Sequence, residues 1–201
     1  MDEIPAIEEN NPEHGPPKGG AAGGKFTASC YELAEVMVSA ILVIAAMFIF
    51  LFRFAGVVGE SMVPNLHNAD WLAISASLAK PQRGDVVIIS QKNAHNVPLV
   101  KRVIATEGES IDIRDGCVWI NGEKLDESGY LAESVQTFAA PPGSASTTLP
   151  MRVPRGYVFV MGDNRGASSD SRSSAVGLIN ENYILGKVLL RLRPFGQFWV
   201  R

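Results

Sequence analysis

A long apolar run lies near the N-terminus, between two more polar stretches. From Leu33 to Phe54 nearly every residue is apolar, with Glu35 near one end and Arg53 near the other. A run of this length matches one helical crossing of a bilayer. Its apolar residues cover every helical face and do not form one stripe, so a buried core helix is the weaker interpretation. The pattern predicts a transmembrane anchor over residues 31–54.

A cleaved secretory signal is the other interpretation of this run. It would need a basic start, a shorter apolar core and a small-residue cleavage site close behind, whereas Arg53 and Phe54 follow here. An uncleaved, single-pass anchor is therefore favoured. Lys18 and Lys25 precede the run, which gives a small bias toward a cytoplasmic N-terminus. We expect an anchor in the plasma membrane with the following domain outside the cytoplasm.

The residues in front of the anchor have a different composition. Residues 1–25 are rich in Pro, Gly, Asn and Glu and contain few large apolar side chains. Such a segment cannot bury enough surface to offset the entropy lost on ordering. We expect a disordered tail over residues 1–30.

Behind the anchor the pattern changes to short runs in which apolar and polar residues alternate, as they do in half-buried strands. Asp115-Gly116 separates two of these runs and Asn121-Gly122 follows the second, and both are typical hairpin turns. The pattern predicts a mainly β protein, with an antiparallel sheet or barrel-like domain over residues 55–201. The expected strands are Trp71–Ser75, Asp85–Ser90, Leu99–Ala105, Ser110–Ile113, Cys117–Ile120, Tyr157–Met161 and Ile184–Leu192.

One part of this region lacks the alternation. Residues 122–154 contain the run AAPPGSASTTLP, whose Pro, Gly, Ser and Thr content favours irregular structure. We expect a surface insertion there.

Composition and charge exclude several classes of function. The net charge is -3 and the pI is about 5.6, so no basic footprint for nucleic acid is present. Cys30 and Cys117 are expected to be unpaired, and their spacing fits no metal site. The histidines are scattered, so the sequence suggests neither a zinc site nor a Ser/His triad; they are His14, His67 and His95.

Four short motifs follow the anchor in a fixed order, and together they resemble the type I signal peptidase family. The similarity runs from the anchor almost to the C-terminus and is greatest to the single-anchor members typical of Gram-positive bacteria. It implies a membrane-bound serine endopeptidase with a Ser/Lys dyad and no cofactor or metal. The motifs are GESMVPNL (residues 59–66), RGDVVI (83–88), KRVIA (101–105) and MGDNRGASSDSR (161–172).

The resemblance identifies Ser61 as the nucleophile and Lys101 as its general base. A serine hydroxyl needs a base to remove its proton, and no histidine is placed for this by any motif. Only a neutral amine can accept the proton, so the lysine needs an apolar surround that lowers its pKa. Strand alternation puts Lys101 on the face opposite Val100 and Arg102, and by itself would leave it as an ordinary surface lysine. Arg102 is expected to face solvent or a carboxylate and to take no catalytic step.

The last motif supplies the supporting residues that the resemblance implies. The hydroxyl of Ser168 would orient the lysine amine, and Asp170 would form an ion pair with Arg172. Asp163 and Asn164 are expected to hold the turn by side-chain to backbone hydrogen bonds. Without the resemblance, this segment has the composition of an ordinary polar turn.

The nucleophile motif departs from parts of the family at two positions. Gly59 stands where some members carry a serine that donates to the oxyanion hole, which leaves backbone donors, chiefly the Ser61 amide. Asn65 stands where threonine is usual. Met62 is expected to fill apolar space under the nucleophile loop.

The implied function is the removal of N-terminal signal peptides from exported preproteins. Cleavage would follow small residues of the A-x-A type, through an acyl-enzyme. The partners would be the preproteins and the lipid bilayer, and the oligomeric state stays open. Two alternatives remain: another Ser/Lys peptidase such as a self-cleaving repressor, and an anchored β-domain that only binds exported chains.

Overall fold

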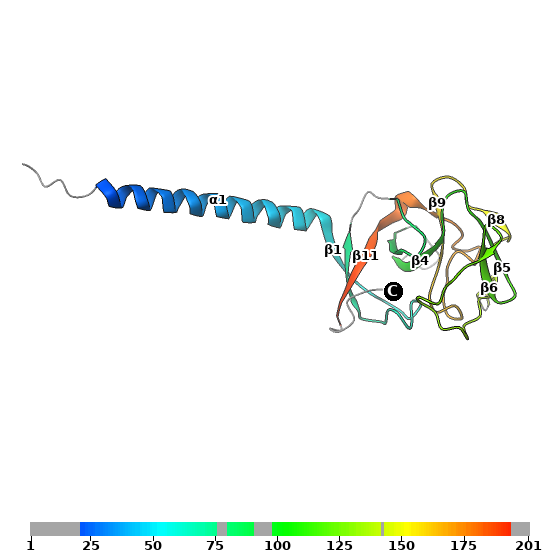
Figure 1. The fold of residues 1–201 in the computed structure, drawn as a ribbon. Helices are drawn as coiled ribbons and strands as arrows, with labels where there is room; N and C mark the ends of the chain where they lie inside the picture. The colour runs from blue at the N-terminus through cyan, green and yellow to red at the C-terminus, as the bar shows by residue number, and fades with distance from the viewer. Residues whose placement is uncertain (1–20, 76–79, 91–97, 142, 194–201) are drawn as a thin grey trace, which may run out of the picture. The chain divides into compact units, whose positions relative to one another are not determined.

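The computed structural model describes residues 21–75, 80–90, 98–141 and 143–193. The chain forms two compact units, Met1–Ala46 and Met47–Arg201. The first contains most of the only long helix in the described part of the chain, and the second contains the strands (Figure 1). The protein is mainly β, as the alternating pattern predicts.

Helix α1, Ala21–Leu51, carries the apolar run. Its segment Cys30–Met47 has a mean hydropathy of 1.9, and no part of that segment is buried inside the protein. The helix is therefore long and apolar enough to cross a membrane. It begins before residue 31, so residues 21–30, expected in the disordered tail, are helical. Ala21 and Ala22 are strong helix formers, and no proline follows Pro17 in this region.

The first strand corrects the other end of the expected anchor. The helix stops at Leu51, and β1, Phe52–Gly56, pairs antiparallel with β2, Trp71–Ser75. Pairing runs from Phe52 opposite Ser75 to Gly56 opposite Trp71. Aromatic residues suit strands as well as apolar helices, and β2 offers a row of backbone groups to pair with. The prediction that the anchor extends to residue 54 is therefore wrong.

The larger sheet has seven antiparallel strands in the order β1-β2-β11-β3-β4-β9-β10. Strand β11 crosses back between β2 and β3, and β4 lies between β3 and β9. A 3-10 turn, Glu181–Tyr183, leads into β11. The remaining strands are β3 (Val86–Ile89), β4 (Leu99–Ala105), β9 (Tyr157–Met161), β10 (Ile179–Asn180) and β11 (Ile184–Arg193).

The smaller sheet has four strands in the order β7-β6-β5-β8. Its two tight turns have the conformation that the sequence predicts: Asp115 and Gly116 have φ of 53° and 71°, and Asn121 and Gly122 have φ of 53° and 86°. Positive φ at both central residues is typical of type I′ hairpin turns. The strands are β5 (Ser110–Arg114), β6 (Cys117–Ile120), β7 (Glu123–Lys124) and β8 (Met151–Arg152).

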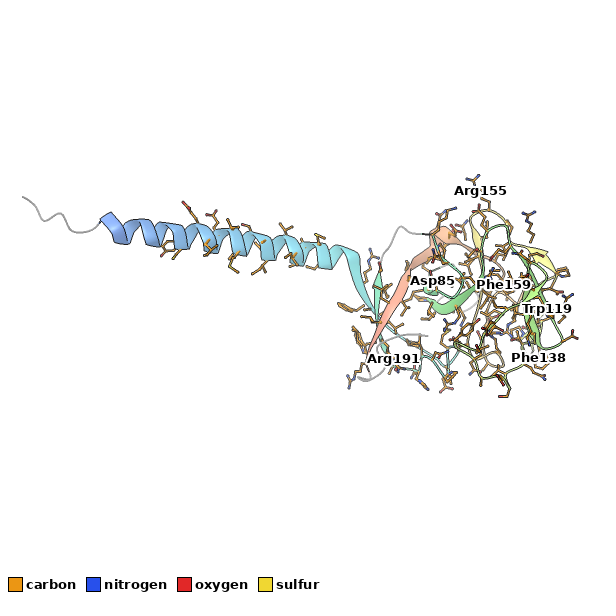
Figure 2. All side chains as sticks on the ribbon, viewed as in Figure 1. Asp85, Trp119, Phe138, Arg155, Phe159 and Arg191 are labelled. Atoms are coloured by element: carbon orange, nitrogen blue, oxygen red, sulfur yellow. The ribbon has the colours of Figure 1, made fainter. Side chains whose placement is uncertain are left out.

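Buried apolar side chains fill the space on both faces of β4 and β9. Phe159 is fully buried and packs with Ile111, Val118 and Ile120 of the smaller sheet, and it is labelled among the crowded side chains of Figure 2. A second cluster, which includes Met62, lies beneath the loop between β1 and β2. The core therefore supports both segments that carry the predicted dyad.

The expected insertion, residues 122–154, is largely irregular between β7 and β8. It is more than a surface excursion, because Leu131, Thr137 and Val153 are buried. Cys30 is an exposed thiol and Cys117 a half-buried one, and both are free.

Candidate active site

The nucleophile motif forms a compact turn between β1 and β2. The amides of Asn65 and Leu66 both donate to the carbonyl oxygen of Met62, at 2.9 Å each. The side chains of Met62 and Leu66 are buried in the apolar cluster below. Ser61 remains half-buried above them. Apolar packing thus fixes the turn and leaves its serine accessible, and Met62 fills the space expected of it.

Gly59 has a backbone conformation that other residues rarely adopt, with φ of +95°. No atom would obstruct a side chain there, so the requirement for glycine is conformational and not steric. The amide of Gly59 donates to Asn68 Oδ1 at 3.1 Å, which ties the two ends of the turn together. The position carries no hydroxyl, so it offers no side-chain donor toward a reacting carbonyl.

Lys101 lies on β4, opposite Val87 of β3, and only 2% of it is exposed. Its Nζ lies 2.6 Å from Ser61 Oγ, within hydrogen-bond distance. Burial lowers the pKa of Lys101 from 10.5 to about 8; the nearby carboxylates of Asp170 and Asp163 oppose this shift, and the Arg172 guanidinium adds to it. A minor fraction of the amine is therefore neutral near physiological pH and able to accept a proton, whereas at a pKa of 10.5 almost none would be.

Arg102, the next residue on β4, is also buried. Its Nε and Nη2 donate to the two carboxylate oxygens of Asp163, at 2.8 and 2.7 Å, and its Nη1 donates to the Gly84 carbonyl at 2.9 Å. Arg102 was expected to face either solvent or a carboxylate, and it faces the carboxylate of Asp163. Lys101 and Arg102 point to opposite faces of β4, as successive residues of a strand do. Both are nevertheless buried, because both faces of β4 are covered at this point.

Within the residues that the structure describes, neither Asp163 nor Asn164 holds its own turn by side-chain to backbone hydrogen bonds as expected. The carboxylate of Asp163 accepts from the Arg102 guanidinium and from Asn65 Nδ2, so side chains and not the local backbone are its partners. Asn164 donates twice to the nucleophile loop: its amide to the Ser61 carbonyl at 3.0 Å and its Nδ2 to the Glu60 carbonyl at 3.1 Å. A buried carboxylate is stabilised best by a cation, which explains the difference at Asp163.

Ser168 is buried close to the dyad, but its expected hydrogen bond to Lys101 is not formed. Within the described part of the chain, its Oγ has no hydrogen-bond partner. The hydroxyl packs against Gly162, where any β-carbon would overlap both Ser168 Oγ and the Ser61 carbonyl oxygen. Ser168 and the nucleophile therefore face the same small volume. A buried hydroxyl without a partner costs free energy.

Asp170 and Arg172 form the ion pair that the resemblance implies. Arg172 Nε and Nη2 each donate to the Asp170 carboxylate at 2.8 Å, and both side chains are fully buried. Asp170 Oδ2 also accepts from the amide of Gly162 at 3.0 Å. The pair therefore fixes the end of β9, next to Ser168 and the nucleophile loop.

Several supporting residues were given no role on the basis of the sequence. The buried guanidinium of Arg165 donates to the Gly162 carbonyl at 3.0 Å, and also binds Glu127 and Thr137 of the insertion. Arg165 belongs to the GDNR part of the last motif, and this membership was the sequence signal that could have identified it. No local pattern marks its partners, because they come from the irregular segment.

A cavity of about 410 Å³ opens onto the dyad. Residues 53–58 of β1 and the following turn line one side, and residues 98–101 line another. Among the described residues that line it, the side chains other than those of Ser61, Lys101 and Arg53 are apolar. Such a surface suits an uncharged, extended peptide.

Comparisons with known proteins identify one family. The family described as "Signal peptidase, peptidase S26" matches residues 30–193. "Signal peptidase I T" of Bacillus subtilis (strain 168) is 34% identical over 177 residues, covering 86% of this chain and 90% of the relative. "Signal peptidase IB" of Staphylococcus aureus is 31% identical over 184 residues, covering 83% and 93%. A crystal structure of a signal peptidase I from Enterococcus faecalis V583 is similar at 30% identity and a TM-score of 0.43, covering 55% of this chain and 98% of that one. The chain belongs to the signal peptidase family, peptidase S26, whose members are serine endopeptidases that remove signal peptides from preproteins.

Proposed function

We propose that this signal peptidase cleaves its substrates with Ser61 as nucleophile and Lys101 as general base. The observation that carries the proposal is the 2.6 Å separation of Ser61 Oγ and Lys101 Nζ, with the lysine buried. A buried amine with a pKa of about 8 is a base suited to an alcohol nucleophile.

The reaction begins with the neutral form of Lys101. The Ser61 hydroxyl donates its proton to Nζ while Oγ attacks the scissile carbonyl, and the Ser61 amide stabilises the oxyanion. The lysine ammonium then protonates the leaving amine, which releases the mature protein and leaves an ester on Ser61. Water, deprotonated by the same lysine, hydrolyses that ester. Ser168 would orient the amine by closing its hydroxyl onto Nζ, a step supported by the unpartnered hydroxyl beside the nucleophile.

The substrate would bind as an extended strand along the cavity. Within the described residues, β1 pairs on one side only, with β2. Pairing of β4 with β9 begins at Arg102, so residues 99–101 pair with β3 alone. Both open edges line the cavity, where a peptide could add main-chain hydrogen bonds. Apolar walls suit the small apolar side chains before the cut that the A-x-A rule describes.

Membrane attachment would serve the same reaction. The apolar helix supports an anchor, and the positive residues before it favour a cytoplasmic N-terminus with the peptidase domain outside. We infer that the enzyme is a single-pass protein of the plasma membrane. Because a preprotein is tethered to the same surface, confinement raises its effective concentration without any further contact.

The two alternative functions have less support. A self-cleaving repressor does not need an apolar helix of this kind, and the family match lies with signal peptidases. A domain that only binds exported chains would not need a buried lysine beside a serine, because burial of an amine costs free energy.

A cleavage assay tests the proposal. The full chain is purified in detergent and given a preprotein with an Ala-x-Ala site, and wild type is compared with Ser61→Ala and Lys101→Ala. Wild type should release the mature protein at that site, and both variants should lose at least about 1000-fold in rate. Equal cleavage by all three proteins would contradict the dyad. Equal cleavage when both small residues are changed to Phe would contradict the proposed specificity.

A further inference from the structure

Tyr130, in the irregular insertion, contacts both chain segments that carry the dyad. Its carbonyl oxygen accepts a hydrogen bond from Asn65 Nδ2 at 2.8 Å, in the turn that holds Ser61. Its ring lies 4.1 Å from the guanidinium carbon of Arg102, the residue after Lys101. One residue of the insertion thus bridges the segment of the nucleophile and the segment of the base.

The insertion holds Tyr130 in this position through its own hydrogen bonds. The phenol donates to Glu127 Oε1 at 2.7 Å, and Glu127 in turn binds the buried Arg165. The amides of Tyr130 and Leu131 both donate to the Glu127 carbonyl, and the side chain of Leu131 is buried. Burial and the adjacent Glu127 raise the pKa of Tyr130, so the phenol stays neutral and keeps donating. The ring is therefore a fixed part of the site and not a mobile cover.

Asn65 connects the nucleophile turn to both Tyr130 and Asp163. Asn65 Nδ2 donates to Asp163 Oδ2 at 2.7 Å and also to the Tyr130 carbonyl. One amide nitrogen thus uses both of its protons, which the single hydroxyl of a threonine could not do. The departure from the usual threonine at this position is matched by a contact to the insertion.

We propose that Tyr130 is a positioning residue for the signal peptidase reaction, which holds Ser61 and Lys101 in register through Asn65 and Arg102. The inference rests on the proposed roles of Ser61 and Lys101. Tyr130 takes no chemical step and acts through the residues that it contacts.

The ring has an electrostatic effect in addition to a geometric one. It covers the Arg102–Asp163 pair, whose side chains are 3% and 0% exposed. The charged groups that influence Lys101 are Asp163, Asp170 and Arg172, and both carboxylates favour its protonated form. Loss of the ring would loosen Arg102 from Asp163, and the less fully neutralised Asp163 carboxylate would stabilise the lysine ammonium. The amine would then lose its proton only at higher pH.

The test compares Tyr130→Ala with Tyr130→Phe in the full chain. Phenylalanine keeps the ring and the backbone carbonyl and removes only the bond to Glu127. Phe138→Ala is the matched control, because this aromatic residue of the same insertion is 59% exposed and only its backbone carbonyl meets the site, at Arg172. For each protein, kcat/KM on an Ala-x-Ala peptide is measured as a function of pH, together with the thermal unfolding midpoint.

Tyr130→Ala should lower kcat/KM by roughly 10- to 100-fold, since small displacements of reacting groups have effects of this size. In the pH profile of kcat/KM for this variant, the acidic limb should move to higher pH by about half a unit or more. Tyr130→Phe should stay within about threefold of wild type with the limb unmoved, and Phe138→Ala should match wild type. A Tyr130→Ala protein with a lower rate but an unmoved limb would show a merely structural role and overturn the proposal, as would a wild-type rate.

A second variant keeps the inference testable if Tyr130→Ala does not fold. Tyr130→Leu retains an apolar side chain over Arg102 but no aromatic face, and it should move the limb in the same direction; an unmoved limb would overturn the proposal. Ser61→Ala is assayed in parallel. If it remained active, the proposed function would fail whatever Tyr130 does, whereas an inactive Ser61→Ala beside an unaffected Tyr130→Ala would refute the positioning role alone.

Discussion

Gly162 packs so closely against Ser168 that no β-carbon fits between its backbone and the Ser168 hydroxyl. The same space is bounded by the Ser61 carbonyl oxygen. The glycine carbonyl accepts from Arg165, and its amide donates to Asp170, so the backbone there is held from both sides. A substitution cannot be accommodated by moving Gly162 and must displace Ser168 or the nucleophile turn.

Gly162→Ala should therefore reduce kcat/KM by about 100-fold or more, because Ser61 or its partners move away from the reacting geometry. Overpacking should also destabilise the fold by about 1–3 kcal/mol. Steady-state cleavage and thermal unfolding measure the two effects. Gly166→Ala is the control from the same loop, since nothing lies within 4 Å of its β-carbon position. Equal activity of the two variants would contradict the packing argument.

Ser168→Ala should separate activity from stability. The hydroxyl that it removes is buried and has no partner, so its loss should leave the unfolding free energy unchanged or slightly higher. If the hydroxyl orients Lys101 during the reaction, kcat should nevertheless fall by roughly 10- to 100-fold, since correct orientation of a catalytic group contributes effects of this order. Chemical denaturation and cleavage rates of the same preparation provide the comparison. Full activity of Ser168→Ala would remove this residue from the mechanism.

The pH dependence of the reaction follows from Lys101. Its pKa is lowered from 10.5 to about 8 by burial, and only the neutral amine accepts the serine proton. The value of kcat/KM should thus rise with pH and level off above about 8, falling about tenfold per unit at lower pH. A profile on a neutral peptide between about pH 6 and 10 tests this. A rate that stayed constant down to pH 6 would show that the essential base is not this lysine.

Most strands were predictable because they are short runs rich in apolar residues, several of them bounded by turn residues. Such runs indicate β2, β4, β6 and β9 with their observed bounds, and Asp115-Gly116 marks a turn that needs positive φ. Strand β1 was not predicted because Phe52–Gly56 continues the apolar run of the helix. An apolar sequence alone does not distinguish a helix from a strand. The two-residue strands β7, β8 and β10 are defined by their partners and have no pattern of their own.

The site was predictable only where a motif carries it. Ser61 and Lys101 were identified through the resemblance, since alternation would place Lys101 at the surface; its burial arises from packing on both faces of β4. The contacts of Glu127 and Tyr130 depend on where a Pro- and Gly-rich segment returns to the sheet. Such long-range pairing is decided by tertiary packing and leaves no periodic signal in the sequence.

Asp170→Ala should be among the most destabilising substitutions near the site. It would leave the Arg172 guanidinium buried without its carboxylate and the Gly162 amide without its acceptor. Removing one partner of a buried ion pair typically costs about 3–5 kcal/mol. Asp112→Ala is the matched control: its pair with Arg114 is partly exposed, with atoms 3.9 Å apart, and should contribute less than about 1 kcal/mol. Similar losses in urea unfolding for both variants would refute the structural role of the buried pair.

The identity of the base can be tested most directly by replacing Lys101 with an amine of lower intrinsic pKa. Lys101→Cys, made in a Cys30→Ser and Cys117→Ser background, is alkylated with bromoethylamine to give a lysine analogue with sulfur in the side chain. After mass spectrometry confirms a single modification, kcat/KM on an Ala-x-Ala peptide is measured against pH. Lys101→Cys should be inactive, and alkylation should restore cleavage with the acidic limb at lower pH than in the wild-type enzyme. Cleavage by unmodified Lys101→Cys, no recovery after modification, or recovery with the limb unmoved would contradict Lys101 as the base that activates Ser61.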